Sequence, residues 1–191
     1  MGKWQKLQLN NIYQNQWIQL NVDKVLRPDG EKGEYSVITT SDTISIIVKE
    51  ENCKIRLVYL HRYPNDSYYW EVIKGRQDGE SPQDTARREL AEEMGLAAGK
   101  WTKIGYFEPS NGLVRETNTV YLAENLQILN YNKQGEEGIE DVKAFTLGEI
   151  EDMIRDNEII DGFTIAAIHK YKLFMDPASS KMMQDKKGNN V

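Results

Sequence analysis

The chain has 191 residues, a net charge of −6 and a single cysteine. Its length suits one domain, or one domain with a small extension, and its 39% hydrophobic and 28% charged content are ordinary for a globular protein with a buried core. The negative net charge argues against a nucleic-acid polymer as a partner. No run approaches the roughly 18 apolar residues of a membrane helix, so we expect no membrane partner.

The first six residues lack the apolar stretch of a signal peptide, which together with the single cysteine predicts a cytoplasmic protein. Cys53 has no possible partner for an internal disulfide. It alternates with Ile55 and Leu57, and this spacing indicates a buried strand residue rather than a nucleophile.

Residues 1–42 are expected to form a β extension. Residues 17–22 alternate, with Ile18, Leu20 and Val22 on one face, and a turn signal at residues 28–30 precedes a second strand at 35–38. A sheet this small cannot bury enough surface alone, so it should pack on the main domain or on a second subunit.

The main domain is expected at residues 43–175. It begins with strands at 44–49 and 54–62, joined by a polar turn at 50–52. Arg62, at the end of the second strand, is either a surface charge or a substrate contact. The aromatic residues 68–70 that follow either belong to the core or stack on a base.

Residues 69–96 have the pattern of a strand, a glycine loop and a helix. Residues 69–73 suit a strand, and the pairs 74–75 and 78–79, each ending in glycine, indicate a loop. Ser81 is the expected N-cap, with Asp84 completing a capping box and Pro82 in the first helical position. Gly95 suits a left-handed C-terminal position, so we expect the helix at residues 82–94.

Three glutamates share one face of this helix. Glu89, Glu92 and Glu93 are spaced i, i+3, i+4, beside an apolar stripe of Ala86 and Leu90. They could form a solvated acidic face. Alternatively they bind a hard divalent cation such as Mg²⁺, which takes oxygen ligands and relieves their mutual repulsion.

The remaining elements follow in order. We expect strands at 101–108 and 116–123, a loop at 130–138 that carries Glu136 and Glu137, and a final strand at 139–142. Helices should begin at Thr146, again with a capping box, and at Asp161. Residues 176–191 are polar and are expected to form a disordered tail.

The 69–96 segment resembles the Nudix box of the Nudix hydrolases. That motif is Gly, five residues, Glu, seven residues, then Arg-Glu-aliphatic-x-Glu-Glu-x-Gly-aliphatic. Residues 80–96 match every fixed position, from Glu80 through Arg88-Glu89 to Gly95. Only four residues separate Gly75 from Glu80, so the loop is one residue shorter than in the motif.

The resemblance implies a Nudix-type α/β/α sandwich with a mixed sheet, and a hydrolase that uses Mg²⁺ or Mn²⁺ to cut a pyrophosphate. It implies that the metal is held by carboxylates of the box helix, by the backbone carbonyl of Lys74 and by Glu71. Arg88 would orient these carboxylates, most directly by pairing with Glu80. The implied metal ligands are Glu71, Lys74, Glu89, Glu92 and Glu93.

The segments outside the box are similar to the ADP-ribose pyrophosphatase branch over residues 15–175. This similarity implies a substrate contact for Arg62, with Gly75, Glu80 and Glu116 also on the substrate side. It implies a catalytic glutamate in the 130–138 loop, Glu136 or Glu137, acting with Glu92 and Arg88. The expected reaction converts ADP-ribose to AMP and ribose 5-phosphate.

The same branch implies a homodimer in which the extension of one subunit lies near the site of the other. The alternative is an extension that folds back on its own domain. Two other functions stay open: another Nudix substrate, such as a dinucleoside polyphosphate or GDP-mannose, and a nucleotide-sugar-binding module that regulates a partner without turnover. Three intact glutamates at 89, 92 and 93 weigh against the second, because a binder does not need them.

Overall fold

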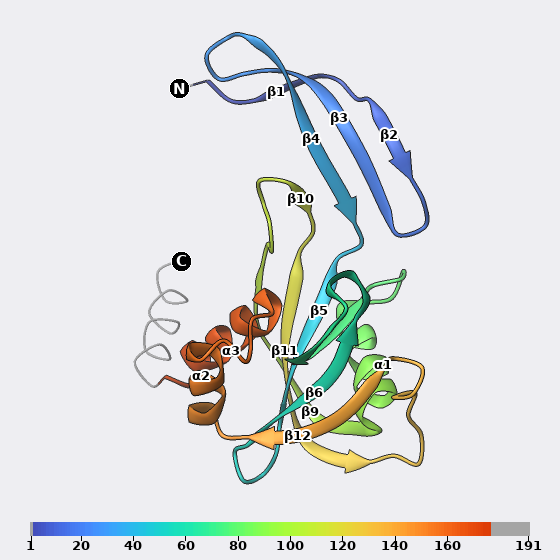
Figure 1. The fold of residues 1–191 in the computed structure, drawn as a ribbon, viewed down its shortest axis with the longest axis vertical. Helices are drawn as coiled ribbons and strands as arrows, with labels where there is room; N and C mark the ends of the chain where they lie inside the picture. The colour runs from blue at the N-terminus through green and yellow to red at the C-terminus, as the bar shows by residue number, and fades with distance from the viewer. Residues whose placement is uncertain (1, 177–191) are drawn as a thin grey trace, which may run out of the picture.

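The computed structural model describes residues 2–176, which form two β-sheets and three α-helices (Figure 1). The expected disordered tail at 176–191 lies, beyond its first residue, outside the described residues. The blue N-terminal sheet projects from one end of the molecule, and the second sheet lies between α1 on one face and the pair α2 and α3 on the other (Figure 1).

The N-terminal sheet is built from the first 40 residues and one short strand of the main domain. Its strands are β1 (Gln5–Gln8), β2 (Asn11–Gln14), β3 (Ile18–Leu26), β4 (Lys32–Thr40) and β10 (Val114–Arg115). The order is β1-β3-β4-β10, with β2 also paired to β3. Because β10 pairs with β4 in parallel, this sheet is anchored on the main domain through backbone hydrogen bonds.

The two faces of β3 are used differently from what the apolar pattern suggests. The residues buried along this strand are Asn21, Asp23 and Val25. The alternate face, which carries Ile18, is partly or fully exposed. Much of the apolar surface of the extension is therefore open within a single chain, chiefly at Trp4, Leu7, Leu9, Ile12, Tyr13 and Trp17.

The second sheet is mixed. Its strands are β5 (Thr43–Lys49), β6 (Ile55–Arg62), β7 (Ser67–Glu71), β8 (Ile73–Arg76), β9 (Leu96–Phe107), β11 (Asn118–Ile128) and β12 (Ile139–Phe145). The central order is β12-β6-β5-β11-β9, in which β5 and β11 are parallel. β8 pairs with the first half of β5, and β6 pairs only with its end, so β7 and β8 occupy the space where the sheet divides.

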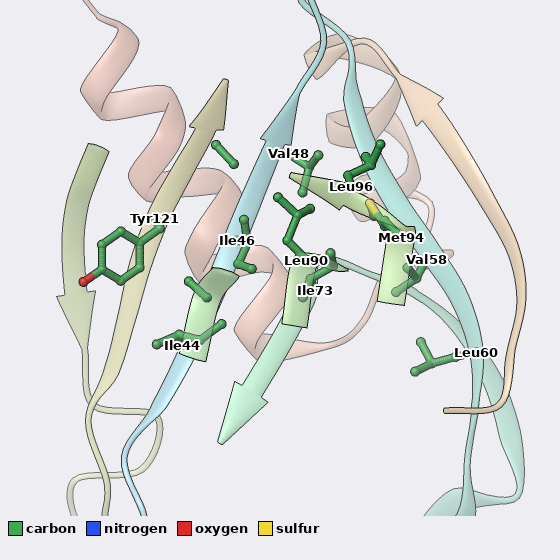
Figure 2. Close-up of a cluster of buried hydrophobic side chains, with 12 residues drawn as sticks. Ile44, Ile46, Val48, Val58, Leu60, Ile73, Leu90, Met94, Leu96 and Tyr121 are labelled. Atoms are coloured by element: carbon green, nitrogen blue, oxygen red, sulfur yellow. The ribbon is translucent and has the colours of Figure 1, made fainter. Parts of the chain in front are cut away.

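Three α-helices cover this sheet: α1 (Pro82–Met94), α2 (Leu147–Arg155) and α3 (Gly162–Met175), while a short 3-10 turn, η1 (Tyr63–Asn65), follows β6. One apolar core lies under α1, where Leu90 packs against Ile46 and Ile73 (Figure 2). The other lies under α2 and α3, around Ile47 and Ile168. β5 contributes side chains to both cores. Its burial on both faces explains its nearly continuous apolar sequence. The predicted α/β/α sandwich is confirmed.

The bounds of α1 agree with the sequence prediction. The Ser81 hydroxyl accepts a hydrogen bond from the Asp84 amide, and Gly95 has a left-handed conformation with φ of 63°. One detail differs, since the Ser81 hydroxyl donates to the Asp84 carboxylate at 2.6 Å. In α2 the capping box of Thr146 and Glu149 is complete, as expected.

Two local predictions were wrong. Cys53 is exposed in the turn between β5 and β6, with φ of 65°, and its amide donates to the Glu50 carbonyl. The connection between β5 and β6 spans residues 50–54 rather than 50–52, and it therefore includes the cysteine. Lys74 and Gly75 belong to β8 rather than to a loop, because they pair with Ser45 and Ile44.

Candidate active site

α1 presents its three glutamates to the sheet and not to solvent. Glu89, Glu92 and Glu93 are all buried, at 8%, 9% and 6% exposure. The same helix face carries Leu90, so the packing of the apolar stripe on β8 also carries the carboxylates inward. This burial excludes a simple solvated acidic face.

Arg88 is the cation at the centre of the cluster. Its Nε lies 3.1 Å from Glu80, and its terminal nitrogen lies 2.9 Å from Glu89 and 3.1 Å from Glu92. The guanidinium also donates to the Arg76 carbonyl at 3.4 Å. The expected pairing of Arg88 with Glu80 is therefore present.

Gly75 on β8 lies directly against Glu89. A Cβ atom added at Gly75 would lie 2.2 Å from the Glu89 Cγ and 2.5 Å from its Oε1. Real side chains do not approach so closely, and only glycine allows this contact. The fixed glycine of the box thus has a steric role here, which brings the backbone of β8 onto a carboxylate of α1.

Burial sets the charge state of the two innermost carboxyls. It raises the pKa of Glu89 to about 7, although Arg88 opposes the rise. Burial raises the pKa of Glu93 well above its usual range, and repulsion from Glu89 and Glu137 adds to the effect. Attraction from Arg62 opposes the rise in the pKa of Glu93 but does not outweigh it.

Glu92 differs because Lys133 reaches it from the loop before β12. The Lys133 ammonium pairs with its carboxylate and lowers its pKa. The Lys133 amide donates to the Glu92 carbonyl at 2.7 Å, and the Gln134 side chain donates to the Glu93 carbonyl at 2.9 Å. These contacts hold the 130–138 loop on the end of α1.

A second buried carboxylate, Glu71, lies at the end of β7. Arg62 donates to it at 2.6 Å through one terminal nitrogen and at 3.2 Å through Nε. The Lys74 ammonium lies 2.8 Å from Glu71 and 3.0 Å from Asp161 at the start of α3. Burial would raise the pKa of Asp161, but Lys74 and Thr164 outweigh it and the pKa is lowered.

A cavity of about 310 Å³ joins these groups. Among the predicted site residues it brings together Arg62, Lys74, Gly75, Arg88, Glu89, Glu93 and Glu137. Glu71, Glu80 and Glu92 do not line the cavity but pair with cations that do. Glu71 pairs with Arg62, and Glu80 and Glu92 pair with Arg88. Glu136 does not line the cavity, and of the two loop glutamates Glu137 is the one that does.

Glu116 lies elsewhere. Its carboxylate accepts a hydrogen bond from the Thr43 hydroxyl at 2.7 Å, and it lines a different cavity of about 470 Å³ between the N-terminal sheet and the 108–117 loop. Within one chain, the structure therefore does not bring Glu116 together with Glu89 and Glu93.

Four residues that line the cavity were missed as site residues: Trp17, Leu60, Arg76 and Asp78. Trp17, from the N-terminal extension of the same chain, lies over Arg76, with the guanidinium carbon 3.8 Å from the ring centre. At Trp17, this contact within one chain favours the alternative in which the extension folds back on its own domain over contact with a second subunit. A lone tryptophan before a strand carries no local sign of such a contact, since it forms across nearly 60 residues.

The chemistry of this donor set fits a hard divalent cation. The available ligands are carboxylate and carbonyl oxygens, and three of the carboxylates, Glu89, Glu93 and Glu137, line the same cavity. In residues 2–176 no three carboxylate, imidazole or thiol side chains converge closely enough to hold a metal, because Glu89 and Glu92 point to Arg88. Ligation therefore requires these side chains to turn away from the guanidinium.

Comparison with known proteins places this geometry in a family. A NUDIX domain model matches residues 39–163, and a model of the nucleoside diphosphate sugar hydrolase N-terminal domain matches residues 4–38. The chain belongs to the Nudix hydrolase family. Within that family it is of the ADP-ribose pyrophosphatase type, as the sequence resemblance implied.

The relatives cover most of the chain. It is 30% identical over 164 residues to an ADP-ribose pyrophosphatase of Bacillus subtilis (strain 168), covering 85% of this chain and 89% of that protein. It is 26% identical over 173 residues to a methanol dehydrogenase activator of Bacillus methanolicus, covering 87% and 91%. The fold matches a crystal structure of an ADP compounds hydrolase with a TM-score of 0.78, at 17% identity and 90% and 94% coverage. None of the helices in residues 2–176 is long and apolar enough to cross a membrane.

Proposed function

We propose that this hydrolase converts ADP-ribose to AMP and ribose 5-phosphate with Mg²⁺, or with Mn²⁺ in its place.

 The substrate is ADP-ribose, a nucleoside diphosphate joined to a sugar. The observation that carries the proposal is the convergence of Arg62, Glu89, Glu93 and Glu137 on one cavity, with Gly75 pressed against Glu89.

The residues that would hold the metal are Glu89, Glu93 and the backbone carbonyl of Lys74, with Glu92 and Glu71 as further predicted ligands. Once bound, a divalent cation supplies positive charge for the pyrophosphate oxygens and acidifies a coordinated water. Arg88 would orient Glu89 and Glu92 for the cation, and Glu80 in turn orients Arg88.

Side chains of the cavity would supply the general base and the contacts to the substrate phosphates. Glu137 accepts a proton from the water that attacks one phosphorus, and the bond from that phosphorus to the bridging oxygen breaks. The bridging oxygen leaves with the other phosphate, which stays on its own sugar, so the products are AMP and ribose 5-phosphate. Arg62 lines the same cavity and contacts the substrate phosphates. Glu136 is the weaker candidate for the base because it lies outside the cavity lining.

We also propose that the protein is a homodimer whose extension, residues 1–42, takes part in subunit contact, while residues 43–175 form the hydrolase domain. The support is the open apolar surface of β1, β2 and the link between them, at Leu7, Leu9, Ile12 and Tyr13. Two-fold pairing is the commonest way for a chain to cover such a surface. Glu116 would then serve a site completed by the second subunit.

The test is a substrate panel of ADP-ribose, GDP-mannose, a dinucleoside polyphosphate and NADH, each incubated with Mg²⁺. The proposal expects the highest kcat/KM for ADP-ribose, with AMP and ribose 5-phosphate formed in equal amounts. A higher kcat/KM for the dinucleoside polyphosphate or GDP-mannose would contradict ADP-ribose as the substrate but would leave the assignment of the active site unchanged. No turnover of any substrate would favour the regulatory alternative.

A further inference from the structure

A closed ring of polar contacts joins the start of α3 to the segment between β7 and β8. The Asp161 Oδ2 accepts hydrogen bonds from the Thr164 amide at 2.8 Å and from its hydroxyl at 2.7 Å. The same hydroxyl accepts from the Val72 amide at 3.1 Å. Asp161 is therefore both the N-cap of α3 and the point where that helix meets the neighbouring strands.

Lys74 completes the ring. Its ammonium lies 3.0 Å from the Asp161 Oδ1 and 2.8 Å from the Glu71 Oε2. The Lys74, Asp161 and Glu71 side chains are 18%, 15% and 3% exposed, so water screens these ion pairs poorly. The ammonium also lies 5.2 Å from the centre of the Phe163 ring, in the first turn of α3.

Successive side chains of β8 point to opposite faces of the sheet. Lys74 turns to α3, while its neighbours Ile73 and Gly75 face α1, where Ile73 joins the core and Gly75 contacts Glu89. β8 is thus held from both faces. Gly75 and Glu89 are in close contact. A movement of β8 would therefore change the distance from its backbone carbonyls to the α1 carboxylates.

We propose that Asp161, acting through Lys74, is a positioning residue that holds β8 at the distance from Glu89 needed to bind the metal. The inference rests on the proposed function only for the metal site. It assigns a role to two side chains, those of Asp161 and Lys74, that the proposed function does not use.

The decisive variant is Asp161→Asn. Asparagine caps a helix as well as aspartate does, so the bond to the Thr164 amide is kept while the charge that holds Lys74 is lost. Residues that orient ligands from behind typically change metal affinity by about 10- to 100-fold when replaced. We expect Mn²⁺, titrated into the full-length protein and followed by electron paramagnetic resonance, to bind about tenfold more weakly.

The matched control is Glu124→Gln, which removes a similarly buried carboxylate from Lys49 and Lys100, away from the site. It should leave the Mn²⁺ affinity unchanged. In Asp161→Asn, a saturating concentration of Mn²⁺ should restore most of the turnover, because the loss lies in metal binding and not in folding. Lys74→Gln, which leaves the cap intact, is the second variant and should show the same loss.

Unchanged Mn²⁺ affinity in both Asp161→Asn and Lys74→Gln would overturn the positioning role and leave the proposed function standing. An equal loss in Glu124→Gln would also overturn it, since the effect would then follow general destabilisation. A wild-type protein that binds no Mn²⁺ would overturn the metal site itself, and this inference with it.

Discussion

The side chain of Glu89 occupies the space in which any residue other than glycine at position 75 would place its Cβ atom. A Cβ at Gly75 would meet three side-chain atoms of Glu89, all within 2.6 Å. The position of the Glu89 carboxylate therefore depends on the backbone of β8 at Gly75. Adding one methyl group at Gly75 is a small change that would disturb the site.

Gly75→Ala should therefore lower kcat by about 100-fold or more, because Glu89 must leave its place or β8 must move away from α1. Steady-state kinetics measure the loss. Gly148→Ala in α2 is the matched control, since a Cβ there meets nothing within 4 Å. If Gly75→Ala turns over at the wild-type rate, the contact has no part in catalysis.

Charge removal at the innermost carboxyl is the second prediction. Glu93→Gln keeps the shape of the side chain and should lower kcat by about 100-fold or more, at ~1.4 kcal/mol for each tenfold in rate. The variant should melt at or above the wild-type temperature, because burial at this position disfavours the ionised carboxyl of Glu93 and a neutral amide does not carry that charge. Near-normal rates in both Glu93→Gln and Glu89→Gln would leave no catalytic role for this face of α1.

Local signals were sufficient for the box helix and for most strands. Ser81, Pro82 and Gly95 determine α1 through contacts within one turn, and these can be seen in the sequence alone. Cys53 was misplaced because strand alternation was continued into a turn. The turn is instead formed by Glu50 and Asn52, whose backbone and side chain bind the amides of Cys53 and Lys54.

The site was predictable where the motif specifies it and not beyond. The box identified the carboxylates of α1 and their pairing with Arg88. Lys133 and Asp161 approach the site from loops and helices that lie far away in the sequence, and only the packing of the sheet brings them there. The choice of Glu137 over Glu136 likewise depends on the path of a loop.

The third prediction concerns the oligomeric state. Full-length protein should sediment as a dimer at micromolar concentration, and Ile12→Asp should shift it to monomers by placing a charge on the open face of β2. Ile128→Asp is the control, because Ile128 is more exposed, at 87%, and lies at the end of β11, outside the extension. A wild-type monomer at this concentration would refute the dimer.

The fourth prediction is a pH dependence of stability. Hydrogen bonds from Lys100 and Lys49 lower the pKa of Glu124 in the folded protein. A group with a lowered folded pKa stabilises the fold above its unfolded pKa, about 4.3, and loses that contribution as the pH falls through the folded value. Glu124→Gln should thus reduce the free energy of unfolding at pH 7 by about 1–3 kcal/mol.

The difference between Glu124→Gln and the wild type should shrink as the pH falls through the lowered folded pKa of Glu124, where the wild-type carboxyl also becomes protonated. Urea denaturation at pH 7 and pH 3 measures it. The surface pair of Lys143 and Asp141, changed by Asp141→Asn, serves as the control and should show a smaller difference at pH 7. An equal difference at both pH values would contradict the role of the Glu124 charge.

Hydrolysis of ADP-ribose itself, followed by ³¹P nuclear magnetic resonance, tests the metal-dependent site most directly. Wild-type protein with Mg²⁺ should convert ADP-ribose to equal amounts of AMP and ribose 5-phosphate. Excess EDTA should abolish the reaction, because the predicted ligands are carboxylate and carbonyl oxygens that bind the pyrophosphate only through a cation. Undiminished turnover in excess EDTA would contradict the metal-dependent mechanism.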